Sequence, residues 1–173
     1  MKVKPKTCRN CGEKFIPNKS TQVACSYLCA LNLGRKKVSE DKYKELKEKV
    51  KTLSQYEAEA KTVFQKWIRM RDKDQPCISC GTVKSTVWDG GHYKKAEIYS
   101  GVIFNELNTN IQCGKCNRYL GGNELNYRVG LIAKIGLEAV EQLEQLANET
   151  RRYKFTKDEL TQIKKTYQLK LKK

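Results

Sequence analysis

The stretch that decides the fold runs from Cys77 to Asn117 and reads CISCGTVKSTVWDGGHYKKAEIYSGVIFNELNTNIQCGKCN. Two C-x-x-C pairs bracket it, Cys77 with Cys80 and Cys113 with Cys116. Each pair can hold one edge of a tetrahedral thiolate site, and two pairs complete a closed four-cysteine site for structural zinc. The four cysteines therefore predict a core that is stapled by zinc.

Three polar residues are tied to this scaffold. His92 is the only histidine of the chain, Asp89 comes three residues before it, and Asn117 directly follows the last cysteine. A histidine can make water nucleophilic because its pKa lies near neutrality. A divalent cation can stabilise the phosphorane and the leaving oxygen. The grouping therefore suits metal-assisted phosphodiester chemistry.

The spacing of these residues has a family likeness. The layout C-x-x-C, D-x-G-H, N-x-N-I-Q-C-x-x-C-N resembles the HNH (ββα-metal) nucleases that carry structural zinc. The fuller run DKDQPCISCGT…WDGGHY…FNELNTNIQCGKCN…GNELNYRVGLIAKIG is similar to the NinG family of lambdoid phages, also called Rap. The resemblance covers roughly Trp67 to the C-terminus. The first cysteine module also fits, whereas the connecting segment matches only in being charged and helical.

The resemblance implies roles for individual residues. His92 would be the general base at the end of the first strand, Asp89 and Asn117 the ligands of a catalytic Mg²⁺ or Mn²⁺, and Asn108 the brace of the loop that orients the base. The pattern usually places the acid directly before the histidine, where this chain has Gly91. Asp89 faces the same side of a strand as position 91. It reaches the site only if the two glycines form a bulge.

Residues 1–36 form a separate N-terminal module with a second set of four cysteines, Cys8, Cys11, Cys25 and Cys29. The module is too small to bury a core, so a second structural zinc would supply its folding energy. The alternative is four unpaired surface thiols. The sequence does not decide whether the module contacts DNA or protein.

Residues 37–71 are expected to form one long charged helix. Apolar residues recur at spacings of three and four. Either this seam packs on the chain's own core at its Phe64–Trp67 end, or it pairs with a second subunit. The seam consists of Tyr43, Leu46, Val50, Leu53, Ala60, Phe64 and Trp67.

Residues 72–123 are expected to form the HNH-like nuclease core. A strand leads into His92, a second extended stretch spans Ile98–Phe104, and a short helix opens at Asn117. Residues 124–173 read as helices with an interruption at Gly136, a capping box at Thr156 and Glu159, and a basic tail. Their expected apolar faces are Tyr127, Leu131, Ile132 and Ile135 before Gly136, Val140, Leu143 and Leu146 after it, and Leu160, Ile163, Tyr167 and Leu171 in the last helix. The predicted fold class is α+β, a ββα-metal core with an N-terminal zinc finger, a long helix and C-terminal helices.

The net charge of +16 is unevenly placed. Residues 1–51 hold 14 Lys/Arg and 5 Asp/Glu, residues 52–150 hold 12 of each, and residues 151–173 hold 9 and 2. Two basic arms around a neutral middle suit a grip on a phosphate backbone, although charge runs are often only solvated surface. The candidate DNA-binding residues are Lys94, Lys95, Arg118, Arg151, Arg152, Lys164 and Lys165.

The composition also indicates a compartment. No stretch approaches the roughly 20 apolar residues of a membrane span. The basic start MKVKPKTCRN lacks a following apolar run, so it is not a secretory signal. Eight cysteines without such a signal favour metal binding in a reducing cytosol. We therefore expect a cytoplasmic phage or prophage protein of the bacterial host.

The function implied by the resemblance is a structure-selective DNA endonuclease of phage recombination that cuts Holliday junctions and D-loop-like branches. A homodimer is expected, because two symmetric cuts are simply made by a two-fold pair of sites. One alternative is a non-catalytic zinc-finger protein that binds nucleic acid. Another is an RNA-binding assembly protein of ribosomal type.

Overall fold

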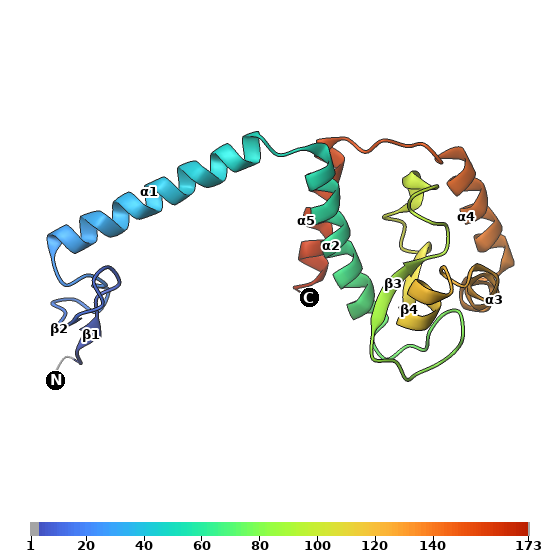
Figure 1. Cartoon of the computed structure of the whole chain (residues 1–173), viewed down its shortest axis with the longest axis horizontal. Helices are drawn as coiled ribbons and strands as arrows, with labels where there is room; N and C mark the ends of the chain where they lie inside the picture. Colours follow the sequence, from blue (N-terminus) through green and yellow to red (C-terminus); the bar gives the residue numbers. More distant parts are fainter. Residues whose placement is uncertain (1–3, 173) are drawn as a thin grey trace. The chain divides into compact units, whose positions relative to one another are not determined.

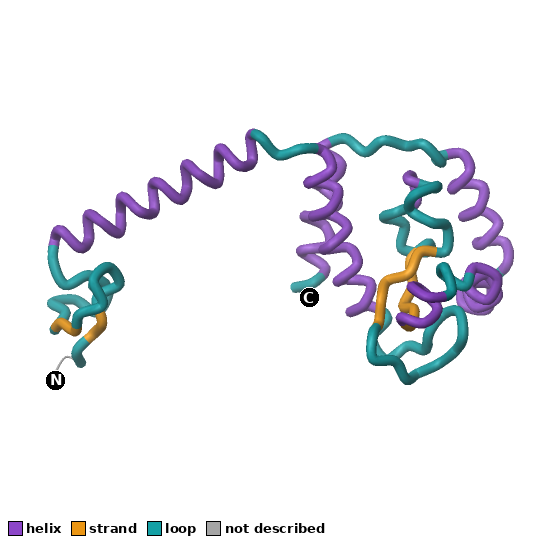
Figure 2. The backbone as a smooth tube through the Cα atoms, viewed as in Figure 1, coloured by secondary structure: helices purple, strands orange, loops and turns teal. Residues whose placement is uncertain are grey.

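A computed structural model describes residues 4–172 and divides the chain into two units, Met1–Lys51 and Thr52–Lys173. Figures 1 and 2 show helices together with two small two-stranded sheets. The fold class is therefore α+β, as expected from the sequence. Within residues 4–172, no helix combines the length and the apolar character that a bilayer crossing requires.

The first unit consists of a small hairpin and one long helix. Strands β1 (Lys6–Thr7) and β2 (Lys14–Phe15) pair antiparallel, and helix α1 spans Tyr27–Lys49. The hydroxyl of Ser26 caps α1 by accepting from the backbone N–H of Cys29 at 3.2 Å. The helix therefore begins ten residues earlier than the predicted start at residue 37, because a cap residue lies inside the cysteine module.

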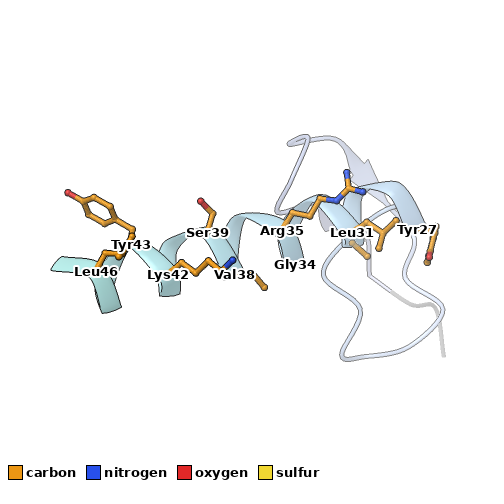
Figure 3. Close-up of a pocket in the computed structure, with 10 residues that line it drawn as sticks. Tyr27, Leu31, Gly34, Arg35, Val38, Ser39, Lys42, Tyr43 and Leu46 are labelled. Atoms are coloured by element: carbon orange, nitrogen blue, oxygen red, sulfur yellow. The ribbon is translucent and has the colours of Figure 1, made fainter. Parts of the chain in front are cut away.

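No residue of α1 is buried. Its apolar side chains share one side of the helix with Arg35 and Lys42 (Figure 3). Leu46, in the expected seam, is 61% exposed. The N-terminal half of the seam thus does not pack on its own unit.

The expected single helix over residues 37–71 is wrong, since the structure has two. The chain leaves α1 at Val50, and α2 (Leu53–Arg71) begins after Thr52. Thr52 and Gln55 form a capping box, in which each side chain bonds the other residue's backbone N–H. The sequence T-x-x-Q of this box is a signal for the start of a helix, but it lies among charged residues that continue the helical pattern on both sides.

The second unit is built around an antiparallel strand pair. Strand β3 (Trp88–His92) pairs with β4 (Thr109–Cys113), with Asp89 opposite Gln112. The prediction of a second extended stretch at Ile98–Phe104 is wrong. That segment contains a 3₁₀ turn, η1 (Ser100–Val102), and a short π-helical turn, η2 (Lys115–Tyr119), follows β4.

Two helix pairs complete this unit. Helices α2 and α5 (Lys157–Lys170) lie along each other, and α3 (Glu124–Ile135) and α4 (Leu137–Glu149) form the other pair (Figure 1). The aromatic ring of Phe64 on α2 lies 4.8 Å from that of Tyr167 on α5, centre to centre. The core of the first pair holds Ala60, Phe64, Trp67, Ile68, Ile103, Phe104, Leu160 and Tyr167. The core of the second holds Tyr93, Val102, Tyr127, Leu131, Val140, Leu143 and Ala147.

The C-terminal helices follow their predicted pattern closely. Gly136 separates α3 from α4, and Thr156 with Glu159 forms the predicted capping box. The exception is Leu146, which is 40% exposed, whereas Ala147 takes the buried position. Trp67 and its neighbours on α2 pack on the chain's own core, so the C-terminal half of the seam has an intrachain role.

Candidate functional site: two cysteine clusters and a histidine at a strand end

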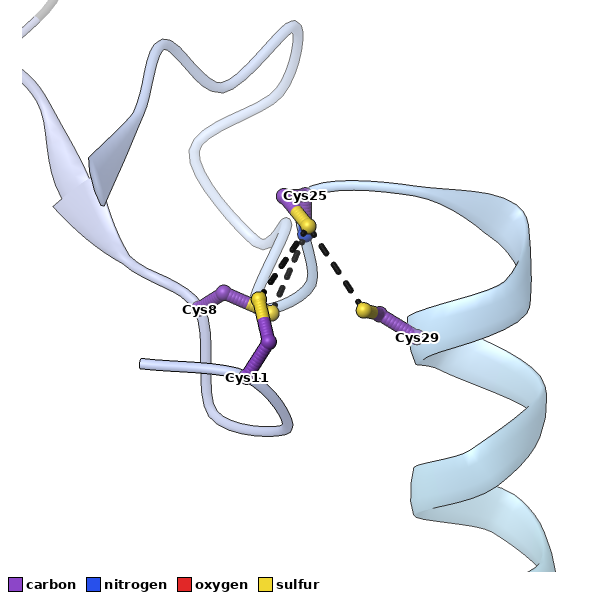
Figure 4. A group of neighbouring side chains, drawn as sticks. All are labelled: Cys8, Cys11, Cys25 and Cys29. Carbon is purple, nitrogen blue, oxygen red and sulfur yellow. Dashed lines mark hydrogen bonds between the residues drawn. The ribbon is translucent and has the colours of Figure 1, made fainter. Parts of the chain in front are cut away.

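The N-terminal unit gathers its four cysteines at one point (Figure 4). Cys8 and Cys11 lie around the β1–β2 turn, Cys25 precedes α1, and Cys29 lies in its first turn. The Sγ atoms of Cys11 and Cys25 lie 3.6 Å apart, as do those of Cys25 and Cys29. Tetrahedral zinc with Zn–S bonds of about 2.3 Å needs a sulfur–sulfur distance of about 3.8 Å. The cluster is therefore compatible with structural zinc.

The second unit forms an equivalent cluster from Cys77, Cys80, Cys113 and Cys116. The Sγ atoms of Cys80 and Cys113 lie 3.8 Å apart. None of the eight cysteines of the chain forms a disulfide bond. The backbone N–H of Cys113 donates to the Cys77 sulfur at 3.3 Å, a bond suited to a thiolate. This cluster is also compatible with structural zinc, and it ties the end of β4 to the loop that follows α2.

His92 ends strand β3 and is half-buried. Its Nε2 lies 3.0 Å from the carbonyl oxygen of Ile103. A carbonyl can only accept, so Nε2 carries the proton and Nδ1 of the neutral ring keeps a free lone pair. Burial lowers the pKa of His92, and the Ile103 carbonyl opposes this only in part. The imidazole is therefore a neutral proton acceptor at pH 7.

Asn108 spans the loop that follows His92, and its side chain is fully buried. Its Oδ1 accepts from the backbone N–H of Lys94 at 2.8 Å. Its Nδ2 donates to the carbonyl oxygens of Lys94 and Val102, each at 3.1 Å. Three hydrogen bonds of this buried side chain thus fix both ends of the segment that places the Ile103 carbonyl oxygen against the histidine.

Asp89 and Asn117 are in direct contact. Asn117 Nδ2 donates to Asp89 Oδ2 at 3.0 Å. Arg118 also holds the carboxylate, through Nε and one terminal nitrogen, each at 2.7 Å. The hydrogen bonds from Arg118, helped by Asn117, lower the pKa of Asp89. Asp89 is therefore an ionised carboxylate that already has a cationic partner.

The structure does not bring Asp89 to His92. The β3–β4 register is regular through both glycines, so the bulge that would pull Asp89 forward is absent among the paired residues. Three residues of strand span about 10 Å, and alternation puts Asp89 and His92 on opposite faces. The Asp89 carboxylate and the His92 imidazole thus lie on opposite faces of β3.

Gly91 has a packing reason to be glycine. A Cβ atom there would lie 2.1 Å from Oε1 of Gln112. Nε2 of Gln112 is fixed by Ser79 Oγ at 2.7 Å and by the Gly122 carbonyl oxygen. Gln112 therefore fills the space that the acid of the HNH pattern would use. Sequence reasoning missed Gln112, because the expected second extended stretch was Ile98–Phe104 and not the strand that contains this glutamine.

The predicted DNA-binding residues divide into paired and free cations. Lys94 pairs with Glu124, Lys164 with Glu59, and Arg118 with Asp89. The remaining four are exposed and make no ion pair within the described part of the chain: Lys95, Arg151, Arg152 and Lys165.

Fold and site together define a small basic α+β protein with two four-cysteine clusters compatible with structural zinc. Residues 35–173 match the family described as Bacteriophage Lambda NinG protein. The chain is 36% identical to Protein ninG of Escherichia phage lambda, with 99% of this chain and 95% of that protein aligned. It is 35% identical to Protein ninG of Salmonella phage P22, over 95% and 91%. The chain therefore belongs to the NinG family of lambdoid phages. No solved structure matches it.

Proposed function

We propose that this protein is a metal-dependent DNA endonuclease that cuts branched DNA during phage recombination, with His92 as the general base. The observation that carries this proposal is the hydrogen bond between Nε2 of His92 and the carbonyl oxygen of Ile103. This bond holds the proton on Nε2, and burial keeps the ring neutral, so Nδ1 can take a proton from water. The preference for Holliday junctions and D-loops rests on the family likeness.

Asp89 and Asn117 would hold a catalytic Mg²⁺ or Mn²⁺, whose charge would stabilise the phosphorane and the leaving oxygen. Because Asp89 and His92 lie on opposite faces of β3, the bound DNA would have to present the same phosphate to both side chains. A carboxylate and a carboxamide oxygen are suitable ligands for a hard cation. Both Asp89 oxygens accept hydrogen bonds from Arg118, so a metal held by Asp89 would have to take the place of this arginine, and Asn117 would have to offer its amide oxygen instead of its Nδ2. The released Arg118 side chain is exposed and free to bind a phosphate of the DNA.

A non-catalytic zinc protein that binds nucleic acid is the second candidate. The Asp89–Arg118 ion pair supports it, because a neutralised carboxylate on the opposite face from His92 needs no metal. In this case the cysteine clusters are purely structural and the basic surface provides the function.

A homodimer follows from the proposed activity. Two symmetric cuts in a four-way junction are most simply made by two active sites, and a two-fold dimer would supply them. Helix α1 offers an exposed apolar stripe that includes Leu31, Val38 and Leu46 (Figure 3). A second copy covering this stripe would remove those side chains from water.

The proposal is tested with labelled duplex, single-stranded and four-way-junction DNA, each with and without Mg²⁺ or Mn²⁺. Cleavage of the junction that needs the metal and is lost in His92→Ala supports the nuclease. Binding without cleavage under all conditions supports the zinc protein instead.

A further inference from the structure

The segment Thr150–Lys154, which we name the strap, connects α4 to α5 and is bound to the loop around η1. The backbone N–H of Gly101 donates to the carbonyl oxygen of Thr150 at 3.1 Å. Ser100 Oγ donates to the carbonyl oxygens of Arg151 and Tyr153 at 3.2 and 2.8 Å. The strap thus turns its backbone carbonyls toward the loop, which leaves its side chains available to solvent.

The same loop holds His92. Ile103, whose carbonyl oxygen contacts the imidazole, directly follows η1, and Asn108 binds the carbonyl oxygen of Val102 within η1. The hydrogen bonds of the strap and those of Asn108 therefore both reach η1. The strap is thus fixed to the turn that orients the imidazole of His92.

The strap is strongly cationic. Arg151, Arg152 and Lys154 are exposed, and none has an ion pair within residues 4–172. Three other arginines of this unit are engaged by carboxylates: Arg71 by Asp72, Arg118 by Asp89 and Arg128 by Glu144. An unpaired guanidinium can bind a phosphate without first giving up a carboxylate.

The surface around the strap is hollowed and partly aromatic. The strap residues Arg151–Lys154 line an open hollow of about 560 Å³ together with Glu97, Ile98 and Ser100. The Arg151 guanidinium lies 5.5 Å from the ring centre of Tyr99. Tyr153 is 43% exposed. Three cations against one carboxylate leave the hollow net positive, and nearby rings suit the bases of a nucleic-acid strand.

We propose that the strap is a phosphate-binding rim that holds one strand of DNA beside His92. Its side chains contact the DNA backbone and position the strand, while the loop around η1 orients the imidazole of His92. The placement beside a cleavage site rests on the proposed nuclease function, whereas the phosphate binding does not.

The test compares two variants of equal charge change. The strap variant is Arg151→Gln, Arg152→Gln, Lys154→Gln. The control is Lys66→Gln, Lys73→Gln, Lys84→Gln, which removes three exposed lysines from α2 and the loops after it. Binding to a fluorescent four-way junction is measured against salt without added Mg²⁺ or Mn²⁺. Each lost phosphate contact lowers the slope of log K against log salt by about 0.9.

We expect the strap variant to lose about 2–3 from the slope and the control to lose less than about 1. A strap variant with the slope of the control would overturn the proposal. The zinc content and the circular dichroism of both variants should match the wild type, because the altered side chains are exposed. Gly101→Ala gives a second readout without a charge change, since its Cβ would lie 2.3 Å from Thr150 and displace the strap. It should also weaken binding, and wild-type binding would contradict the proposal.

Comparing the strap variant with His92→Ala distinguishes a failure of the phosphate-binding rim from a failure of the proposed nuclease function. If His92→Ala cuts like the wild type, the nuclease mechanism fails, but the loss of salt slope in the strap variant still establishes the phosphate rim. If the strap variant binds normally while His92→Ala loses cleavage, the rim fails and the nuclease stands.

Discussion

Replacing Gly91 by alanine adds only one methyl group, but it should destabilise the second unit strongly. The new Cβ would lie 2.1 Å from Oε1 and 3.1 Å from Cβ of Gln112. Gln112 can move away only by breaking its buried hydrogen bonds to Ser79 and to the carbonyl of Gly122. Each buried group left unsatisfied costs about 1–3 kcal/mol, so we expect a loss of about 2–4 kcal/mol in the free energy of unfolding. The backbone of Gly91 is not left-handed, so conformational strain adds little.

Urea unfolding with zinc and a reducing agent measures this loss, and a double-mutant cycle assigns it to Gln112. Gln112→Ala removes the side chain that the new methyl group would strike. The double variant Gly91→Ala, Gln112→Ala should therefore be about as stable as Gln112→Ala alone, with a coupling energy of about 2 kcal/mol or more. Additive losses would refute the steric argument, and so would a Gly91→Ala protein as stable as the wild type.

Three further predictions concern metals and assembly. Elemental analysis of protein purified under reducing conditions should find two zinc ions per chain, and a folded, active sample with one zinc or none would contradict this. Cys77→Ser should unfold the second unit, because metal binding there is coupled to folding. Arg118→Gln should lower the Mn²⁺ concentration needed for half-maximal cleavage, and Asn117→Ala should raise it. If the wild type and both variants need the same Mn²⁺ concentration, Asp89 and Asn117 do not bind the catalytic metal. Leu46→Asp should give monomers in sedimentation, whereas the control Lys44→Asp should remain dimeric, and a monomeric wild type would end the dimer hypothesis.

The cysteine clusters were the most predictable part of the site. The spacing of Cys77 with Cys80 and of Cys113 with Cys116 limits the thiols to a narrow set of geometries, and metal binding needs few other residues. The buried faces of α3 and α5 were predictable for a similar reason. A regular apolar period and a capping box are local signals that the tertiary structure rarely overrides.

The strands were harder to predict. The run from Ile98 to Phe104 is apolar enough for a strand, yet it forms a turn in which Val102 enters one core and Ile103 the other. A short apolar run cannot be assigned by its period alone. The break between α1 and α2 was missed because lysines and glutamates dominate the sequence around Thr52.

The electrostatics of the site depend on contacts between distant residues. The sequence places Asp89 three residues before His92, but it does not reveal that Arg118 binds both carboxylate oxygens or that Gln112 fills the space beside Gly91. Both contacts cross the strand pair and arise only when β3, β4 and η2 are assembled. These are the features that separate this chain from the simple HNH pattern.

The central claim is tested most directly by the pH dependence of junction cleavage in the wild type and in His92→Ala. Because burial lowers the pKa of His92, the wild-type rate should rise through one ionisation below about 6.5 and be level at pH 7 and above. His92→Ala should lose about 10²–10⁴-fold in rate, without the acidic limb and with unchanged zinc and junction binding. Near-normal cleavage by His92→Ala, or an acidic limb that persists in it, would contradict the account.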